Sequence, residues 1–142
     1  MSRHFSEHEL VFSLKALELS IDNTPSEGIK NQLNFTAAGL ERIRAFLGFP
    51  MEITSGYRSV ALNTAVGGSI NSQHCRGEAA DFICPLFGTP EQVCLFLEPA
   101  RYYLGIDQLI MEGSWVHVSF TLDPRYHVLT KHADGTYSPG LK

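Results

Sequence analysis

Two short stretches of the sequence carry the residues that most constrain the fold of this chain. The first holds His74 and Asp81, and the second, further along the chain, holds Glu112 and His117. Two imidazoles and two carboxylates are the groups from which proteins build a zinc site with three ligands and a fourth position open to water. Calcium and magnesium prefer ligands that are all oxygen, so zinc is the metal that this set predicts.

The second stretch predicts a β-hairpin. Glycine leads the two-residue connection 113–114 between two apolar runs, which is typical of a primed turn. In that register Glu112 lies opposite Trp115, Ile110 lies opposite His117, and the alternation of side chains places all four on one face. Glu112 is then a diagonal neighbour of His117, roughly 7 Å away at the backbone. A carboxylate at that position can accept a proton from a water on the metal and return it.

The first stretch has the small residues that a metal next to the backbone requires. Asp81 follows Ala79 and Ala80, so little side-chain bulk blocks the approach of an ion. Gly77 permits the turn that brings His74 back beside Asp81.

The motif Ser-x-His-x-x-Gly-x-Ala-x-Asp at 72–81, followed by Glu112 and by Trp-Val-His-Val-Ser at 115–119, resembles a known family. It is similar to the zinc D-alanyl-D-alanine carboxypeptidase and peptidoglycan endopeptidase family, which is grouped with the lysostaphin and hedgehog zinc domains. The similarity is closest to the compact phage-type members. It covers nearly the whole chain, from the first helix through Ser-Gly-Tyr-Arg at 55–58 to residue 120.

The resemblance implies one Zn²⁺ ion bound by His74, Asp81 and His117, with Glu112 as the general base. Several relatives place the catalytic acid three residues before the last histidine, where this chain has Ser114, whereas Glu112 stands five before it. The metal ligands are therefore better defined by the motif than the base.

The resemblance also implies a set of substrate-binding residues. Relatives carry an arginine at the position of Arg58, and its fork of donors suits a peptide carboxylate or a developing oxyanion. A structural arginine that binds loop carbonyls is the alternative. We expect Ser72, Tyr57 and Trp115 to line the substrate cleft as well, although Tyr57 and Trp115 could instead be packing residues.

Composition and local signals predict a single zinc peptidase catalytic domain over 1–142. A length of 142 residues, 44% hydrophobic and 18% charged, is ordinary for one globular core. We expect an α+β fold in which helices pack on one face of a small, mostly antiparallel sheet that carries the zinc site. The expected elements are helices after Ser6 and Thr24, a strand over 51–55, a glycine-rich loop that ends at His74, and a helix after Thr89.

The first helix is expected to bury some of its apolar residues, Leu10, Phe12, Leu14, Leu17 and Leu19. The second should end at Gly48 and use Thr24 as its cap with Pro25 at its first position. In the third, Val93, Phe96 and Leu97 should face the core. The tail from Asp123 should form a last hairpin or a loose loop around Asp134-Gly135.

Charge and cysteine content exclude several classes of partner. A formal net charge of −4 lacks the basic footprint of a nucleic-acid binder, and no segment is apolar enough to span a membrane. Three cysteines are too few for a disulfide framework, and we expect Cys84 and Cys94 to be small core residues. The remaining histidines, His4, His8, His127 and His132, lack partners at ligand spacing.

No apolar run of signal-peptide length opens the sequence. We therefore expect synthesis in a reducing cytoplasm and, for an endolysin, action at the cell wall or periplasm after release by a membrane-disrupting partner. The chain is expected to be a monomer.

Together these features predict a zinc peptidase that hydrolyses peptidoglycan stem peptides, in the manner of a phage or prophage endolysin. Two alternatives stay open. One is a non-catalytic zinc-binding recognition module of the same fold, against which the carboxylate of Glu112 argues. The other is a D-Ala-D-Ala dipeptidase or carboxypeptidase that acts on small peptides. The sequence does not indicate which peptide bond is cleaved.

Overall fold

A six-stranded β-sheet forms the centre of the computed structural model, which describes residues 1–141. Its strands lie in the order β1-β2-β4-β3-β5-β6, and all neighbours are antiparallel except β3 and β5. The strands are β1 (Glu52–Ser55), β2 (Ala79–Ile83), β3 (Gln108–Met111), β4 (Val116–Ser119), β5 (His127–Lys131) and β6 (Tyr137–Pro139). The predicted α+β class and the mostly antiparallel sheet are confirmed.

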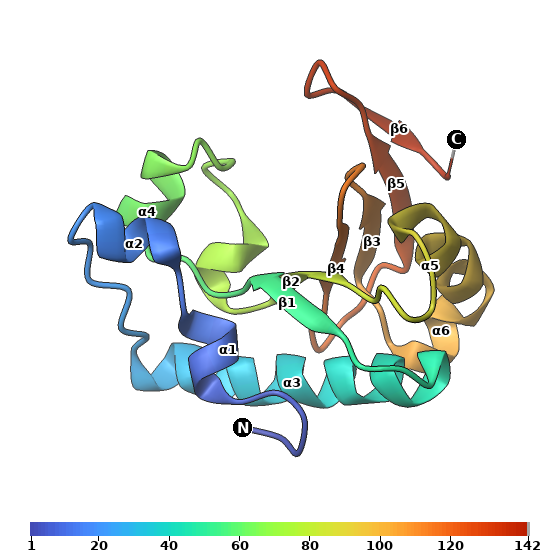
Figure 1. Ribbon diagram of the computed structural model, residues 1–142, viewed down its shortest axis with the longest axis horizontal. Helices are drawn as coiled ribbons and strands as arrows, with labels where there is room; N and C mark the ends of the chain where they lie inside the picture. Colours follow the sequence, from blue (N-terminus) through green and yellow to red (C-terminus); the bar gives the residue numbers. More distant parts are fainter. Residues whose placement is uncertain (142) are drawn as a thin grey trace.

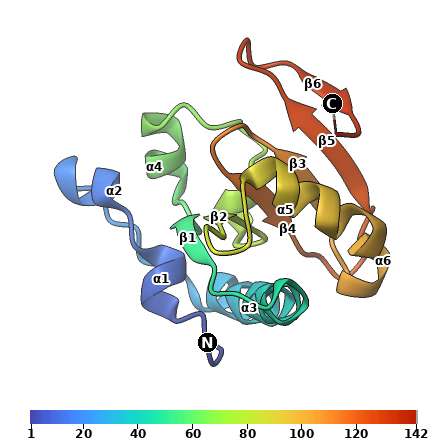
Figure 2. The same ribbon diagram turned by 45° about the vertical axis from the view of Figure 1, so that its right-hand side comes forward.

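Helices pack against this sheet, and the longest of them, α3, runs along one side of it, whereas β5 and β6 project away from the helices (Figure 1). The helices are α1 (Glu7–Val11), α2 (Leu14–Glu18), α3 (Glu27–Leu47), α4 (Val60–Ala65), α5 (Pro90–Leu97) and α6 (Arg101–Leu104), with short 3₁₀ helices η1 (Gln73–Arg76) and η2 (Glu98–Ala100). Helix α5 packs against β3 and β4 (Figure 2). The apolar faces of α3 and α5 share one core with the inner face of the sheet.

Alternation along the central strands separates this core from a polar face. Val116 and Val118 on β4 and Phe82 on β2 are completely buried in the core. His117 and Asp81, one residue along from these, point to the opposite side of the sheet. The polar side chains of the two sequence stretches therefore gather on the face away from α3 and α5.

Helix α3 begins later than the sequence indicated. The side chain of Ser26 caps it by accepting from the backbone N–H of Ile29 at 3.3 Å, so Thr24 and Pro25 lie outside the helix. Ser26 is the N-cap because it directly precedes Glu27, the first residue of the helix. The helix ends as predicted at Gly48, which adopts a left-handed conformation with φ 80°.

The N-terminal segment forms two short helices where one was expected. Ser6 caps α1 in the predicted capping box with Glu9, and Leu10 is buried. The chain becomes extended at Phe12, and Ser13 begins α2 by accepting from the N–H of Ala16 at 3.1 Å. Of the five apolar residues from which a buried set was expected, only Leu10 is buried, whereas Phe12, Leu14, Leu17 and Leu19 are exposed.

The predictions for the helix after Thr89 and for the loop before His74 were confirmed only in part. Thr89 caps α5 with Pro90 at its first position, and Val93 and Leu97 face the core as expected. Phe96 does not, since it is 43% exposed and packs on a surface cluster with Phe46 and Phe87. The loop before His74 contains an unpredicted helix, α4, which Ser59 caps.

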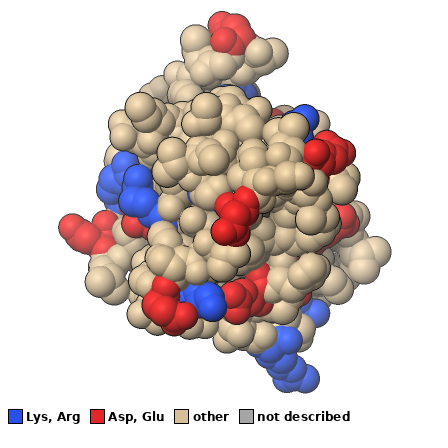
Figure 3. All heavy atoms as spheres, turned by 90° about the vertical axis from the view of Figure 1, so that its left-hand side faces the viewer, with Lys and Arg blue, Asp and Glu red and all other residues tan. Residues whose placement is uncertain are grey.

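The C-terminal segment forms the predicted hairpin from β5 and β6, with Gly135 in a left-handed conformation between them. Cys84 and Cys94 are buried in the core, as predicted. Among the described residues no helix combines the length and apolarity that crossing a membrane requires. On the face shown in Figure 3, acidic and basic side chains of both signs are scattered over a largely uncharged surface.

Candidate active site

Asp81 and His117 face each other across the two central strands of the sheet. They are direct partners in the antiparallel β2–β4 register, which places both side chains on the polar face. His117 Nδ1 lies 3.0 Å from Asp81 Oδ1. Only 8% of each residue is exposed, so solvent screens this contact weakly.

His74 reaches the same point from η1. Gly77 ends η1 in a left-handed conformation with φ 74°, and the chain turns directly into β2, as the sequence predicted. The carbonyl of Gly56 lies 2.7 Å from His74 Nδ1 and accepts its proton, which directs Nε2 toward Asp81, where it can bind a metal once it has lost its proton. Gly56 has no room for a side chain, because a Cβ there would lie 2.1 Å from the backbone oxygen of Leu10.

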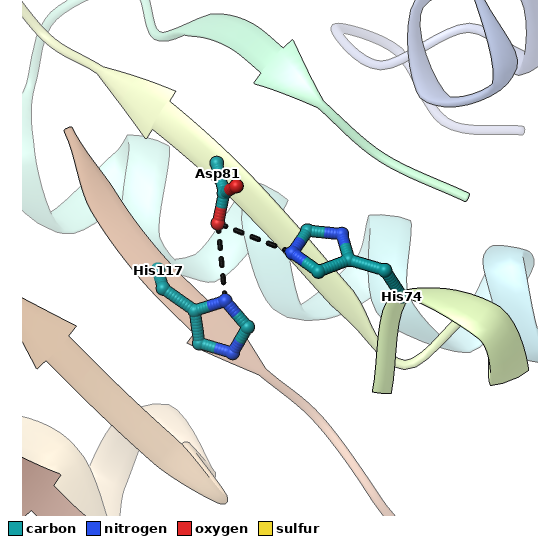
Figure 4. A group of neighbouring side chains, drawn as sticks. All are labelled: His74, Asp81 and His117. Atoms are coloured by element: carbon teal, nitrogen blue, oxygen red, sulfur yellow. Dashed lines mark hydrogen bonds and ion pairs between the residues drawn. The ribbon is translucent and has the colours of Figure 1, made fainter. Parts of the chain in front are cut away.

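The three side chains converge on one point, with both rings directed at the carboxylate of Asp81 (Figure 4). His74 Nε2 lies 3.3 Å from Asp81 Oδ1, and the ligand atoms of all three residues lie within 4.8 Å of one another. Two imidazole nitrogens and one carboxylate oxygen are the donor set of a three-ligand zinc site. A carbonyl that holds the second nitrogen of a ligand histidine is also typical of such sites. The residues therefore fit a zinc ion.

The electrostatics of the cluster favour an ionised Asp81. Burial alone would raise the pKa of its carboxyl, but the positive charge of His74 and the hydrogen bond from His117 outweigh burial. The pKa of Asp81 consequently lies well below its usual range. A carboxylate that is already deprotonated is ready to bind a cation.

Glu112 lies beside this cluster, in the hairpin register that the sequence predicted. Ile110 pairs with His117, and the N–H of Glu112 donates to the carbonyl of Trp115 at 3.2 Å. Gly113 takes the positive φ of 86° that a primed turn needs. Glu112 Oε2 lies 3.6 Å from His117 Nδ1, and its side chain is 11% exposed. Ser114, the alternative position for an acid, lies in the turn and is exposed.

The cluster forms the floor of an open cleft of about 910 Å³. Arg58, Ser72 and Trp115 line this cleft, as expected of substrate-binding residues. The side chain of Ser72 also caps η1 by accepting from the N–H of His74 at 3.2 Å. Tyr57 is not among the residues that line the cleft: its side chain packs against the core, and its backbone N–H donates to the carbonyl of Leu10.

Arg58 combines a backbone that is bound within the fold with a side-chain donor, Nε, that is not. Its backbone N–H binds the carbonyl of His74 at 3.1 Å, which ties the residue to η1. Its side-chain Nε is buried and has no hydrogen-bond partner among the described residues. A buried donor without a partner is costly, and Arg58 is one of the residues that line the cleft, where a ligand could accept from its guanidinium.

Sequence reasoning missed several residues that line the cleft. Lys131, Leu129 and Tyr137 come from the β5–β6 hairpin, and Arg76 and Arg125 come from η1 and the loop before β5. No motif marks these residues. The place of the hairpin residues follows from the parallel pairing of β5 with β3, a contact between segments that local patterns do not connect.

An ion pair between the buried carboxylate of Asp107 and the half-exposed Arg125, which also lines the cleft, ties elements of the site together, and it also went unpredicted. Asp107 is 1% exposed, and its carboxylate accepts hydrogen bonds from Arg125 Nε at 2.9 Å and from Gln73 Nε2 at 2.9 Å. Ser119 donates to the same carboxylate at 3.3 Å. Because Gln73 directly precedes His74, this network fixes η1 to β3 and β4.

The pKa of Asp107 reflects that network. Burial would raise it, but the hydrogen bonds from Arg125 and Gln73 and the positive charge of Arg125 lower it to about 2.

Comparison with known proteins agrees with this geometry. A family model described as Peptidase M15 matches residues 3–119. A search of curated protein sequences gave no match. The match covers most of the chain, including every residue of the His74, Asp81, His117 and Glu112 group, and ends at the last residue of β4. The chain belongs to the Peptidase M15 family of zinc metallopeptidases, which confirms the family that the motifs indicated.

Proposed function

We propose that this member of the Peptidase M15 family hydrolyses peptide bonds in the stem peptides of bacterial peptidoglycan. One observation carries the proposal: two histidines and an aspartate converge at the floor of an open cleft, and a second carboxylate lies 3.6 Å from one of the histidines. A site of this kind has the parts that peptide hydrolysis requires, namely a place for a metal, a base and a cleft for the chain.

In the proposed site, His74 Nε2, His117 Nδ1 and Asp81 Oδ1 would hold one Zn²⁺ ion. When bound, zinc lowers the pKa of a coordinated water to about 7 and polarises a carbonyl. Asp81 reduces the positive charge of the site, and the Gly56 carbonyl keeps the His74 ring in the orientation that presents Nε2.

Glu112 would act as the general base and then as the general acid. Its Oε2 faces the cluster, so it can accept a proton from the attacking water and deliver it to the leaving amine. A purely structural metal site has no use for a carboxylate at this position. The arrangement therefore favours catalysis over the alternative of a non-catalytic recognition module.

Arg58 would bind the substrate. Its Nε, which has no hydrogen-bond partner among residues 1–141, and its place on the cleft wall suit a peptide carboxylate or the developing oxyanion. Trp115 and Ser72 would contact the same chain on either side.

The size of the cleft bears on the second alternative. Small-molecule sites typically have volumes of about 300–1,000 Å³, and at about 910 Å³ this cleft lies near the upper end. That size favours a stem peptide over the free dipeptide D-alanyl-D-alanine. The role of a phage or prophage endolysin is supported by the resemblance of the motifs to compact phage-type relatives.

The test combines metal content with product analysis. Purified protein is expected to contain one zinc ion per chain by elemental analysis and to release peptides from purified peptidoglycan, with mass spectrometry of the fragments naming the bond. Glu112→Ala should retain zinc and release nothing. Zinc-loaded wild type that leaves both peptidoglycan and D-alanyl-D-alanine intact would contradict the proposal, and cleavage of the dipeptide alone would favour the dipeptidase.

A further inference from the structure

A row of four side chains crosses four strands at the mouth of the cleft. Trp115 precedes β4, Glu112 follows β3, Lys131 ends β5 and Tyr137 begins β6. Glu112 lies opposite Trp115 in the hairpin, and Lys131 is the register partner of Tyr137. Since Met111 pairs with Thr130 in the parallel β3–β5 ladder, Glu112 and Lys131 are the next pair along it. All four line the cleft.

Glu112 stands in this row with a different partner at each carboxylate oxygen. Oε2 lies 3.6 Å from His117 Nδ1, and Oε1 lies 3.5 Å from Lys131 Nζ. A glutamate side chain that follows the last residue of a strand has several rotamers open to it, and a proton acceptor must be held in a productive geometry. In the observed rotamer Oε1 contacts Lys131 while Oε2 is turned toward the cluster.

Lys131 is itself supported from the far side. Its Nζ lies 5.8 Å from the centre of the Tyr137 ring, on the strand that pairs with its own. The ring restricts the long lysine side chain, 39% of which is exposed, and adds a cation–π contact. A series of contacts therefore runs from the Tyr137 ring on β6 through the ammonium of Lys131 to the carboxylate of Glu112.

The hairpin that supplies this support lies outside the segment that defines the family. The Peptidase M15 match ends at residue 119, before β5 and β6. The base and the three candidate metal ligands belong to the matched segment, whereas Lys131 and Tyr137 do not. Support for Glu112 from this side is thus a property of the C-terminal hairpin.

We propose that Lys131 is a positioning residue, which holds Oε1 of Glu112 so that Oε2 faces the metal cluster, and that Tyr137 braces it. The proposal rests on the proposed function, because it assigns Lys131 a role through the base of that reaction. It assigns Lys131 no contact with the substrate.

The first test separates kcat from KM on the peptidoglycan fragment that the wild type cleaves. Lys131→Met should lower kcat roughly tenfold, since a misplaced reacting group costs that much or more, with KM and zinc content unchanged. Lys131→Arg, which keeps a cation within reach of Oε1, should recover most of the rate. Lys15→Met, which removes an exposed lysine on α2, is the matched control. A rise in KM with kcat unchanged would overturn the proposal and make Lys131 a substrate-binding residue.

The second test asks whether Lys131 acts through Glu112. In a Glu112→Gln background, Lys131→Met should cause little further loss of rate, because the group that it positions no longer accepts a proton. Equal losses from Lys131→Met in both backgrounds would show an independent role and overturn the proposal.

A structural readout does not depend on activity. In crystal structures at high resolution, Glu112 should occupy one rotamer in the wild type and in Tyr137→Phe, which keeps the ring. It should be displaced or divided between rotamers in Lys131→Met. An unchanged Glu112 in Lys131→Met would refute the positioning role even if the wild type proved inactive on every wall substrate, the result that would refute the proposed function instead.

Discussion

The floor of the cleft and the β5–β6 hairpin at its mouth differ in how their side chains are held. On the floor, the side chains of His74 and His117 are 3% and 10% exposed, and each has a fixed polar partner. On the hairpin, the side chain of Lys131 is 39% exposed, and Tyr137 is 52% exposed. Buried contacts are costly to break and exposed ones are not. We therefore expect the floor to determine whether the proposed chemistry occurs and the hairpin to adjust its rate.

Removal of a floor residue should have the largest effect. His117→Ala is expected to lose zinc and all activity, because two remaining ligands bind the ion weakly and no water is activated. The rise in melting temperature on zinc addition should vanish with it. His127→Ala, an exposed histidine on β5, should behave as wild type. Elemental analysis decides the matter: full zinc content in His117→Ala would remove His117 from the ligand set.

Glu112 links the two regions, and its replacement should rank second. Glu112→Gln keeps the shape of the side chain but cannot accept a proton, so we expect a loss of roughly 10²-fold in kcat with zinc content unchanged. Glu52→Gln, which changes an exposed residue on the edge strand β1, serves as the control. Loss of zinc would instead identify Glu112 as a ligand, and retained activity would mean that the base lies elsewhere.

The ion pair of Asp107 should contribute measurably to the free energy of unfolding. Because the pKa of Asp107 is about 2 in the folded chain and about 3.9 in an unfolded one, its carboxylate contributes about 2 kcal/mol near neutral pH. This contribution is complete above about pH 5 and is lost as the pH falls through about 3.9 toward 2. Asp107→Asn should lower the free energy of unfolding by about that amount at pH 7 in urea titrations, and the gap should close on acidification. A gap that is independent of pH would contradict the ionic role.

Arg58 lies on the wall of the cleft, and its conservative replacement should have the smallest effect. Arg58→Lys keeps the charge but loses the planar fork, so we expect activity to fall roughly tenfold while zinc content stays constant. Arg3→Lys near the N-terminus is a matched control. Rates near those of the wild type would return Arg58 to a structural role.

The parts of the site that were predictable from sequence depend on short-range geometry. A glycine-led turn and period-two alternation are enough to place Glu112 on the His117 face. Gly77 next to a run of small residues is enough to place His74 near Asp81. That serine side chains cap helices was predictable, but which serines do so was not. Ser13 and Ser26 compete with neighbouring residues for the start of a helix, and only tertiary packing decides between them.

The remainder depends on contacts between distant segments. Lys131 approaches Glu112 because β5 pairs in parallel with β3, and no local pattern signals that pairing. Asp107 is ordinary in the sequence and acquires its role from Arg125 and Gln73, which lie on other elements. Tyr57 precedes Arg58 in the motif, but adjacent residues on an extended chain point in opposite directions, so one lines the cleft and the other packs inside.

The order of strands has a consequence for how the molecule opens. Asp81 and His117 sit on β2 and β4, which are interior strands with a hydrogen-bonded neighbour on each side, whereas β1 and β6 form the two edges. Local unfolding proceeds from edges and termini, where fewer bonds must break. Amide protons should exchange first along β6 and last along β4. Thermal fraying of the sheet would thus release the brace of Lys131 well before it disturbs the floor, and activity would decline on warming before the metal is lost.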